Sequence, residues 1–165
     1  MEIRPEIPSD ESAISDLITA AFLGAEHRGG NEACIVEALR KVGNLAVSLV
    51  ATENGEILGH LAFSPVTIDG HSDGWFGLGP VAVVPNRQRE GIGSALIEAG
   101  LDRLRARGSK GCVVLGEPAY YSRFGFTADP DLRLAGVPPE YFQRLKFEEH
   151  PCVGEVKYDA AFGMA

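Results

Sequence analysis

Residues 81–96, Val-Ala-Val-Val-Pro-Asn-Arg-Gln-Arg-Glu-Gly-Ile-Gly-Ser-Ala-Leu, combine residue types that are suited to binding an anion. An apolar, strand-like run leads into a turn, and glycines then stand at the start of a helical pattern. The first amides of a helix lack intrahelical partners, and the helix dipole adds partial positive charge there. Gly91 and Gly93 leave the backbone open to a pyrophosphate, and Arg87 and Arg89 add positive charge nearby.

The same glycines have a second interpretation, in which they only allow the helix to pack closely on the preceding strand. The segment is not a P-loop, because no G-x-x-x-x-G-K-[ST] pattern is present. It is not a G-x-G-x-x-G dinucleotide motif either, because position 96 is Leu.

Two motifs together carry a resemblance to a known family. Gln88-Arg89-Glu90-Gly91-Ile92-Gly93 resembles the [QR]-x-x-G-x-[GA] signature of GNAT acetyltransferases, and Val81, Val83 and Pro85 match the strand that leads into it. Tyr121-Ser122-Arg123-Phe124-Gly125-Phe126 resembles the Y-x-[KR]-x-G-F segment that closes the cofactor groove of that family. The resemblance covers about residues 1–130 and is strongest in residues 78–126.

The resemblance implies an N-acetyltransferase that transfers the acetyl group of acetyl-CoA directly to an amine, without a metal. It implies an α/β (α+β) fold with a mixed, mostly antiparallel sheet and helices on both faces. The sheet is splayed between its fourth and fifth strands, here about 75–84 and 111–115, where the pantetheine inserts. Dimers are common in the family, so a homodimer is possible. The cofactor-binding residues that the resemblance implies are Val81, Ala82, Val83, Gln88, Arg89, Glu90, Gly91, Ile92, Gly93, Ser94, Tyr120 and Phe124.

Tyr121 occupies the family's general-acid position, where it would protonate the departing thiolate. Its alternative role is packing on the cofactor or the core, and a shift of one residue would give Tyr120 the acid role. An amine with a pKa of about 10.4 lies roughly 3.4 units from its neutral form at pH 7, which costs about 4.6 kcal/mol. Glu117, after the fifth strand, is a candidate to orient or deprotonate the amine, although it could equally cap the helix that Pro118 begins.

Other candidates for the general base are less favoured. Residues 75–84 contain no carboxylate or histidine. His60 is more simply a core or solvent-facing histidine, and Glu26, His27 and Arg28 a solvated loop near the acceptor pocket. Many family members also have an Asn about seven residues before the closing tyrosine that binds the pantetheine, whereas position 114 is Val.

The hydrophobic pattern places these motifs on one αβ domain spanning 1–165. Asn54-Gly55 predicts a tight hairpin turn, and Pro65 predicts a bend or an edge. Expected strands cover 2–7, 45–52, 57–68, 75–84, 112–115, 142–147 and 153–162. One expected helix has its N-cap at Ser9 or Asp10, carries apolar residues from Ile14 to Phe22 and is broken by Gly29-Gly30, and the others cover 35–42, 91–107 and 118–123.

Composition limits the possible partners. The chain has 165 residues and a net charge of −8, so nucleic acids and anionic membranes are not expected partners, whereas a cationic amine is favoured. Three widely spaced cysteines and a charged beginning without an apolar stretch predict a cytoplasmic protein with reduced thiols.

Two other functional classes compete with the enzyme. One is a non-catalytic module that binds acyl-CoA on the same fold, because a fold alone does not fix activity. The other is a P-loop-like nucleotide binder, which the missing Lys and Ser/Thr after the glycines disfavours.

Overall fold

The computed structural model describes residues 1–23 and 31–163. Seven strands form the main sheet in the order β1-β2-β3-β5-β6-β9-β7, and β4, β10 and β8 form a smaller sheet in that order. Within the main sheet only the β5–β6 pair is parallel, so the expected mixed and mostly antiparallel sheet is confirmed. The strands are β1 Glu2–Pro5, β2 Val47–Glu53, β3 Glu56–Pro65, β4 Thr67–Ile68, β5 Trp75–Val83, β6 Gly111–Leu115, β7 Thr127–Ala128, β8 Leu132–Arg133, β9 Phe142–Lys146 and β10 Gly154–Lys157.

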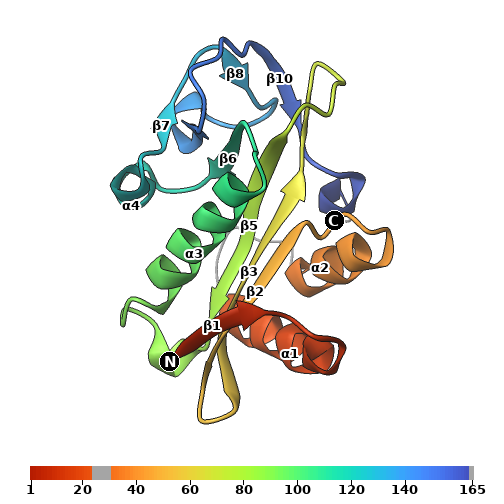
Figure 1. The fold of residues 1–165 in the computed structure, drawn as a ribbon, viewed down its shortest axis with the longest axis vertical. Helices are drawn as coiled ribbons and strands as arrows, with labels where there is room; N and C mark the ends of the chain where they lie inside the picture. The colour runs from red at the N-terminus through yellow and green to blue at the C-terminus, as the bar shows by residue number, and fades with distance from the viewer. Residues whose placement is uncertain (24–30, 164–165) are drawn as a thin grey trace.

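Helices cover both faces of the main sheet, as expected (Figure 1). The amphipathic helix α3, Ile92–Ala106, packs on one face, and α1, Glu11–Phe22, packs with α2, Glu32–Lys41, on the other. The single-turn α4, Pro118–Tyr121, follows β6. Figure 1 shows the small sheet gathered at one end of the molecule, beyond the far end of α3.

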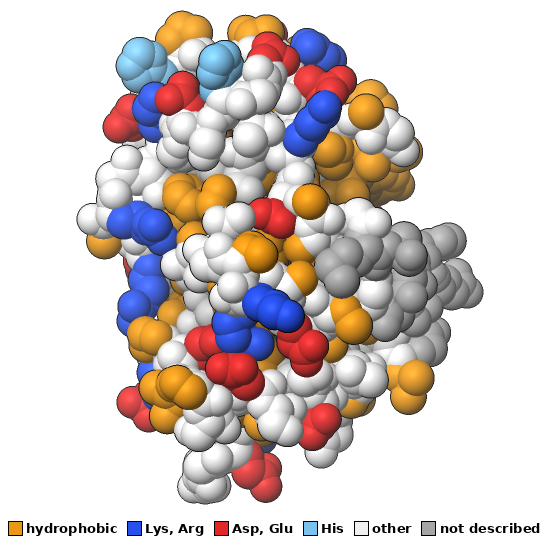
Figure 2. Space-filling model, turned by 90° about the vertical axis from the view of Figure 1, so that its right-hand side faces the viewer, with side chains coloured by type: hydrophobic (Ala, Val, Ile, Leu, Met, Phe, Trp, Pro, Cys, Tyr) orange, Lys and Arg blue, Asp and Glu red, His pale blue; other side chains and the backbone are white. Residues whose placement is uncertain are grey.

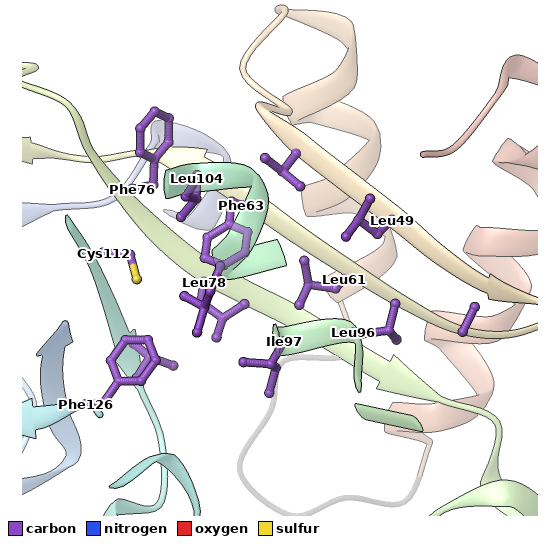
Figure 3. Close-up of a cluster of buried hydrophobic side chains, with 14 of the residues drawn as sticks. Leu49, Leu61, Phe63, Phe76, Leu78, Leu96, Ile97, Leu104, Cys112 and Phe126 are labelled. Carbon is purple, nitrogen blue, oxygen red and sulfur yellow. The ribbon is translucent and has the colours of Figure 1, made fainter. Parts of the chain in front are cut away.

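The largest core cluster lies between α3 and the sheet (Figure 3). Leu61 and Phe63 of β3 meet Leu96, Ile97 and other residues of one α3 face, all of them fully buried. These side chains recur along α3 at helical spacing, so burying that face fixes how the helix lies on the sheet. The start of α3 is thereby held beside the end of β5.

The turn between β2 and β3 confirms the hairpin prediction. Asn54 and Gly55 have φ angles of 52° and 81°, and a type I′ turn requires positive φ at both central residues. The predicted strand 57–68 is divided into β3 and β4 at Pro65, which confirms the expected bend there.

β5 and β6 diverge at the position where the sequence predicted a splayed sheet. They pair only at Trp75–Gly111, Phe76–Cys112 and Gly77–Val113. On the other side, the register between β3 and β5 shifts where β5 passes through Gly79 and Pro80. The shift bends β5 away from β6, so the backbone beyond Gly77 is free to pair with an extended ligand.

The chain after α4 differs from expectation in three strands, because β7 and β8 were not predicted and the last predicted strand is shorter. The predicted strand 153–162 is too long, because only β10 is extended and a 3₁₀ turn at Ala160–Gly163 follows it. Asp159 explains the change, since its side chain accepts a hydrogen bond from the amide of Ala161 and its carbonyl accepts one from Phe162. Aspartate in this arrangement offers the backbone a turn instead of a ladder.

Candidate active site

A cavity of about 540 Å³, here called the α3 cavity, lies between the start of α3, the end of β5 and the α4 region. Its position agrees with the groove that the two sequence motifs predicted. Its walls are Val81, Val83, Arg87, Gln88, Arg89, Gly91, Ile92, Gly93, Ser94, Ile97, Tyr120, Tyr121 and Arg123.

The backbone at the start of α3 is shaped to bind an anion. Arg89 and Gly91 have φ angles of 67° and 87°, on either side of Glu90. Alternation between left-handed and other conformations turns successive N–H groups towards one side. The amide of Ala95 is bonded to the carbonyl of Gly91 at 3.0 Å, so the amides of residues 92–94 precede the first intrahelical bond. A Cβ added at Gly91 would meet no protein atom within 4 Å, so the backbone there is open to a ligand.

Three arginines line this cavity although the chain as a whole is acidic. Arg87 is held by Glu90 at 2.8 Å and Glu53 at 3.2 Å, so its charge is partly compensated. Arg123 stacks over the ring of Tyr120, with its Cζ 4.4 Å from the ring centroid, and donates to the carbonyl of Tyr120. Arg89 completes the set. These three arginines therefore give the cavity a local positive charge.

The two tyrosines of α4 occupy different positions. The hydroxyl of Tyr120 lies 2.9 Å from Oγ of Ser94, which ties α4 to the first turn of α3. Tyr121 packs edge-on against Phe126, and its ring lies so close to Gly116 that any side chain there would overlap it. Burial raises the pKa of Tyr121 to about 12, so its hydroxyl stays protonated at neutral pH.

A second cavity, here called the β5–β6 cavity, has a volume of about 560 Å³. It shares Val81 and Tyr121 with the α3 cavity, so the two hollows meet where β5 and β6 have parted. A ligand in one cavity and a ligand in the other would therefore meet beside the Tyr121 ring. Its walls are Phe22, Glu32, Ile35, Leu78, Gly79, Pro80, Val81, Val114, Leu115, Tyr121, Leu134, Ala135, Tyr158 and Phe162.

Four of the sequence-predicted site residues lie outside the walls of both cavities. The side chain of Ala82 is buried against α1, on the opposite face of β5 from the α3 core, and Glu90 is bonded to Arg87. Phe124 packs against the rings of Tyr120 and Tyr121. Glu117 is exposed, and its carbonyl accepts hydrogen bonds from the amides of both tyrosines, so its backbone caps α4. The other predicted cofactor residues, and Tyr121, line the α3 cavity.

His60 lies in the core and in neither cavity wall. Its Nε2 is 2.8 Å from Oγ of Ser48, which donates to Glu6, and Glu6 is paired with Arg40 at 2.8 Å. Burial lowers the pKa of His60 to about 4, against the attraction of Glu6. The other base candidates, residues 26–28, lie outside the described residues.

Several wall residues were not predicted from the sequence. Ile97 follows from helical spacing, since it lies one turn beyond Gly93. Glu32 at the start of α2 and Tyr158 after β10 carry no local motif, because both are brought to the cavity by tertiary packing.

Residues 1–23 and 31–163 contain no group of three or more His, Cys, Asp or Glu side chains arranged to hold a metal ion. No helix in the same ranges is long and apolar enough to span a membrane.

Comparison with known proteins gives consistent relatives. Residues 2–128 match the model of the acetyltransferase (GNAT) domain. The chain is 41% identical over 136 residues to the uncharacterized N-acetyltransferase YhbS of Escherichia coli K12, covering 81% of this chain and 78% of that protein. A crystal structure of a GNAT family acetyltransferase from Brucella melitensis in complex with acetyl-CoA is 48% identical, with a TM-score of 0.89 and coverage of 98% and 97%. A structure of E. coli YhbS in complex with CoA is 36% identical, with a TM-score of 0.91 and coverage of 98% and 91%.

Proposed function

Because this chain belongs to the GNAT acetyltransferase family and is an acetyl-CoA-dependent N-acetyltransferase, we propose that the α3 cavity holds CoA and that the amine enters through the β5–β6 cavity. The observation that carries this assignment is the meeting of the two cavities at Val81 and Tyr121. The diphosphate then lies at the start of α3, and the pantetheine runs along the unpaired edge of β5. The acetyl group is presented to the amine where β5 and β6 part.

Tyr121 is the general acid in this proposal. The departing thiolate is released between the two cavities, and Tyr121 lines both, whereas Tyr120 lines only the α3 cavity. The Tyr120 hydroxyl is also engaged by Ser94. With its pKa raised to about 12, the Tyr121 hydroxyl holds its proton until the thiolate forms. If the CoA thiol resembles cysteine, with a pKa of about 8.5, the proton gained by sulfur is worth only about 2 kcal/mol at neutral pH.

The amine must reach the thioester in its neutral form. A largely apolar cavity disfavours the ammonium ion, because burial of an unpaired charge is costly, and so lowers the amine pKa. The nitrogen attacks the thioester carbon, the C–S bond breaks, and the thiolate takes the Tyr121 proton. The nitrogen releases its own proton to solvent, since no carboxylate or histidine of β5 is available as a base, and the Tyr121 phenolate takes a proton back from solvent.

The assignment is tested by titrating the purified protein with CoA, acetyl-CoA and ATP in a calorimeter. We expect both CoA species to bind and ATP to be unable to displace them, because no P-loop is present. Thiol release in an amine panel then measures transfer. Absence of CoA binding at millimolar ligand would refute the assignment of the α3 cavity.

Four finer points remain predictions of this proposal. The overall negative charge supports a cationic acceptor, although Figure 2 shows acidic and basic side chains mixed on the face that it presents. A single domain over 1–165, a cytoplasmic location and a homodimer are also predicted, and sedimentation of the purified chain tests the last.

A further inference from the structure

The described residues that line the β5–β6 cavity are mostly apolar. Among the described residues that line it, Glu32 is the only charged side chain, and the tyrosine hydroxyls are the only other polar side-chain groups. Phe22, Ile35 and Phe162 are among the apolar wall residues. A ligand with many amines or hydroxyls would leave several of them unpaired here, at a cost of roughly 1–3 kcal/mol each.

Tyr158 brings a hydroxyl to the inner end of this cavity. Its ring packs edge-on against Phe162, with centroids 5.1 Å apart. A Cβ at Gly77 would lie 3.0 Å from its Cε2 and 3.3 Å from its Cζ. The hydroxyl-bearing end of the ring therefore lies over Gly77, which forms the last β5–β6 pair before the strands part.

The Tyr158 hydroxyl has no hydrogen-bond partner within the described chain, although it is inaccessible to solvent. Ser64 pairs with Gly77 across β3 and β5, so its side chain is on the same face of the sheet as the Tyr158 ring. Its Oγ is likewise buried and without a partner in the described residues. Native proteins satisfy nearly all buried polar atoms, so two unsatisfied hydroxyls beside one glycine indicate a missing polar partner.

The missing partner lies on the face of the sheet opposite the α3 core. Phe76 and Leu78 project into the α3 core, so Gly77 between them faces the opposite side, where Tyr158 lies. We propose that the β5–β6 cavity selects a primary amine carried on an apolar body, an alkyl or arylalkyl amine, whose nitrogen is held at the inner end by the hydroxyl of Tyr158. The apolar body then lies along Ile35 and Phe162.

This assignment rests on the proposed function, because it takes the amine to arrive from that cavity. Glu32 adds the attraction that draws the ammonium form towards the cavity. The neutral nitrogen then donates a hydrogen bond to the Tyr158 hydroxyl oxygen, which leaves its lone pair free to attack the thioester. Burial raises the pKa of Tyr158, so its hydroxyl remains uncharged at neutral pH.

The test compares acceptors by thiol release from acetyl-CoA. Hexylamine and phenethylamine represent the predicted class, and spermidine, a lysine peptide and an aminoglycoside represent polar amines. We expect kcat/KM for the apolar amines to be at least tenfold higher. A preference for the polar amines, with CoA binding intact, would overturn this inference and leave the proposed function standing. Absence of CoA binding would overturn the proposed function itself.

Variants test the hydroxyl of Tyr158. Tyr158→Phe is expected to raise KM for the amine about fivefold or more, with kcat and the Kd for CoA little changed. Tyr141→Phe, at an exposed tyrosine outside the cavity, serves as the matched control. Since the Tyr158 hydroxyl has no partner among residues 1–23 and 31–163, its removal should not lower Tm.

An amine-binding measurement makes the inference independent of turnover. Titration of phenethylamine into the complex with CoA should give weaker binding for Tyr158→Phe than for wild type. Equal binding by the two proteins, or no binding at all, would overturn the role of Tyr158. In that case an ordered water satisfies the two hydroxyls, and a crystal structure with CoA would show it between them.

Discussion

Substitution of Gly91 by alanine separates the two roles of the glycines at the start of α3. Gly91 has a φ of 87°, and an added Cβ meets no protein atom within 4 Å. Its methyl group would instead enter the α3 cavity. A left-handed conformation costs a non-glycine residue roughly 1–2 kcal/mol. For a chain of this length that lowers Tm by about 2–8 °C, at roughly 2–4 °C per kcal/mol.

The effect on cofactor binding should be larger than the effect on stability. A methyl group that displaces the diphosphate from one backbone amide removes a hydrogen bond to a charged group, worth about 1.5–3 kcal/mol. Since about 1.4 kcal/mol is tenfold in Kd, the affinity for CoA should fall roughly 10- to 100-fold. Calorimetry on the folded variant measures this.

Gly43→Ala is the matched control. Gly43 follows α2, has a φ of 81° and also faces open space, yet it lines neither cavity. The Gly43→Ala variant should show the same fall in Tm as Gly91→Ala and keep the wild-type affinity for CoA. Equal CoA affinities in the two variants would refute the assignment of the diphosphate to this helix start, and the glycines would then serve packing alone.

Three further predictions concern single side chains. Tyr121→Phe should lower kcat tenfold or more while the Kd for CoA changes less than twofold, in line with the roughly 10²- to 10⁴-fold effect of a positioned acid, and an unchanged kcat would reject the role. The pKa of His60 is lowered to about 4 in the folded chain. As the pH falls below 6.5, this histidine is therefore protonated in the unfolded chain before it is protonated in the folded chain. Stability should therefore fall by about 2 kcal/mol between pH 7 and pH 5 in urea unfolding, and His60→Gln should lose this slope. Burial disfavours the carboxylate form of Glu6, but hydrogen bonds from Arg40 and Ser48 stabilise it. The pKa of Glu6 is therefore lowered, and it titrates below the range from pH 7 to pH 5. Gly100→Ala should lower Tm despite alanine's better helix propensity, because its Cβ would lie 2.7 Å from the Phe63 ring, and an increase in Tm would contradict this packing.

The walls of the α3 cavity were largely predictable because the information that specifies them is local. Left-handed backbone at Gly91, open space at the helix start and a strand leading into it are properties of consecutive residues, and they leave a pattern in the sequence. The divergence of β5 from β6 was expected from the family resemblance, and Gly79 and Pro80, which interrupt the strand, fit it. Tyr120 and Tyr121 were ambiguous, because adjacent residues of one helical turn differ only in what each side chain meets.

The walls of the β5–β6 cavity were not predictable because they come from distant segments. Glu32 begins α2, Leu134 follows β8 and Tyr158 follows β10, and none stands in a pattern that distinguishes it from a surface or core residue. The predicted long strand at 153–162 also concealed Tyr158, which lies beyond the end of β10. Glu117 was a candidate because it follows the fifth strand, with helix capping as the equal alternative, and its side chain is exposed to solvent.

Part of the β5–β6 cavity is lined by residues of the tail, beyond residue 128. The acetyltransferase domain match ends at residue 128, whereas the Brucella melitensis acetyltransferase aligns over 98% of the chain and so includes the tail. Leu134, Tyr158 and Phe162 all lie beyond residue 128 and line the β5–β6 cavity, but none lines the α3 cavity. Substitutions in the tail should therefore change which amine is used without changing the affinity for CoA. Substitutions at the start of α3 should weaken CoA binding equally for every amine, because the diphosphate is held in the same way whichever acceptor is bound.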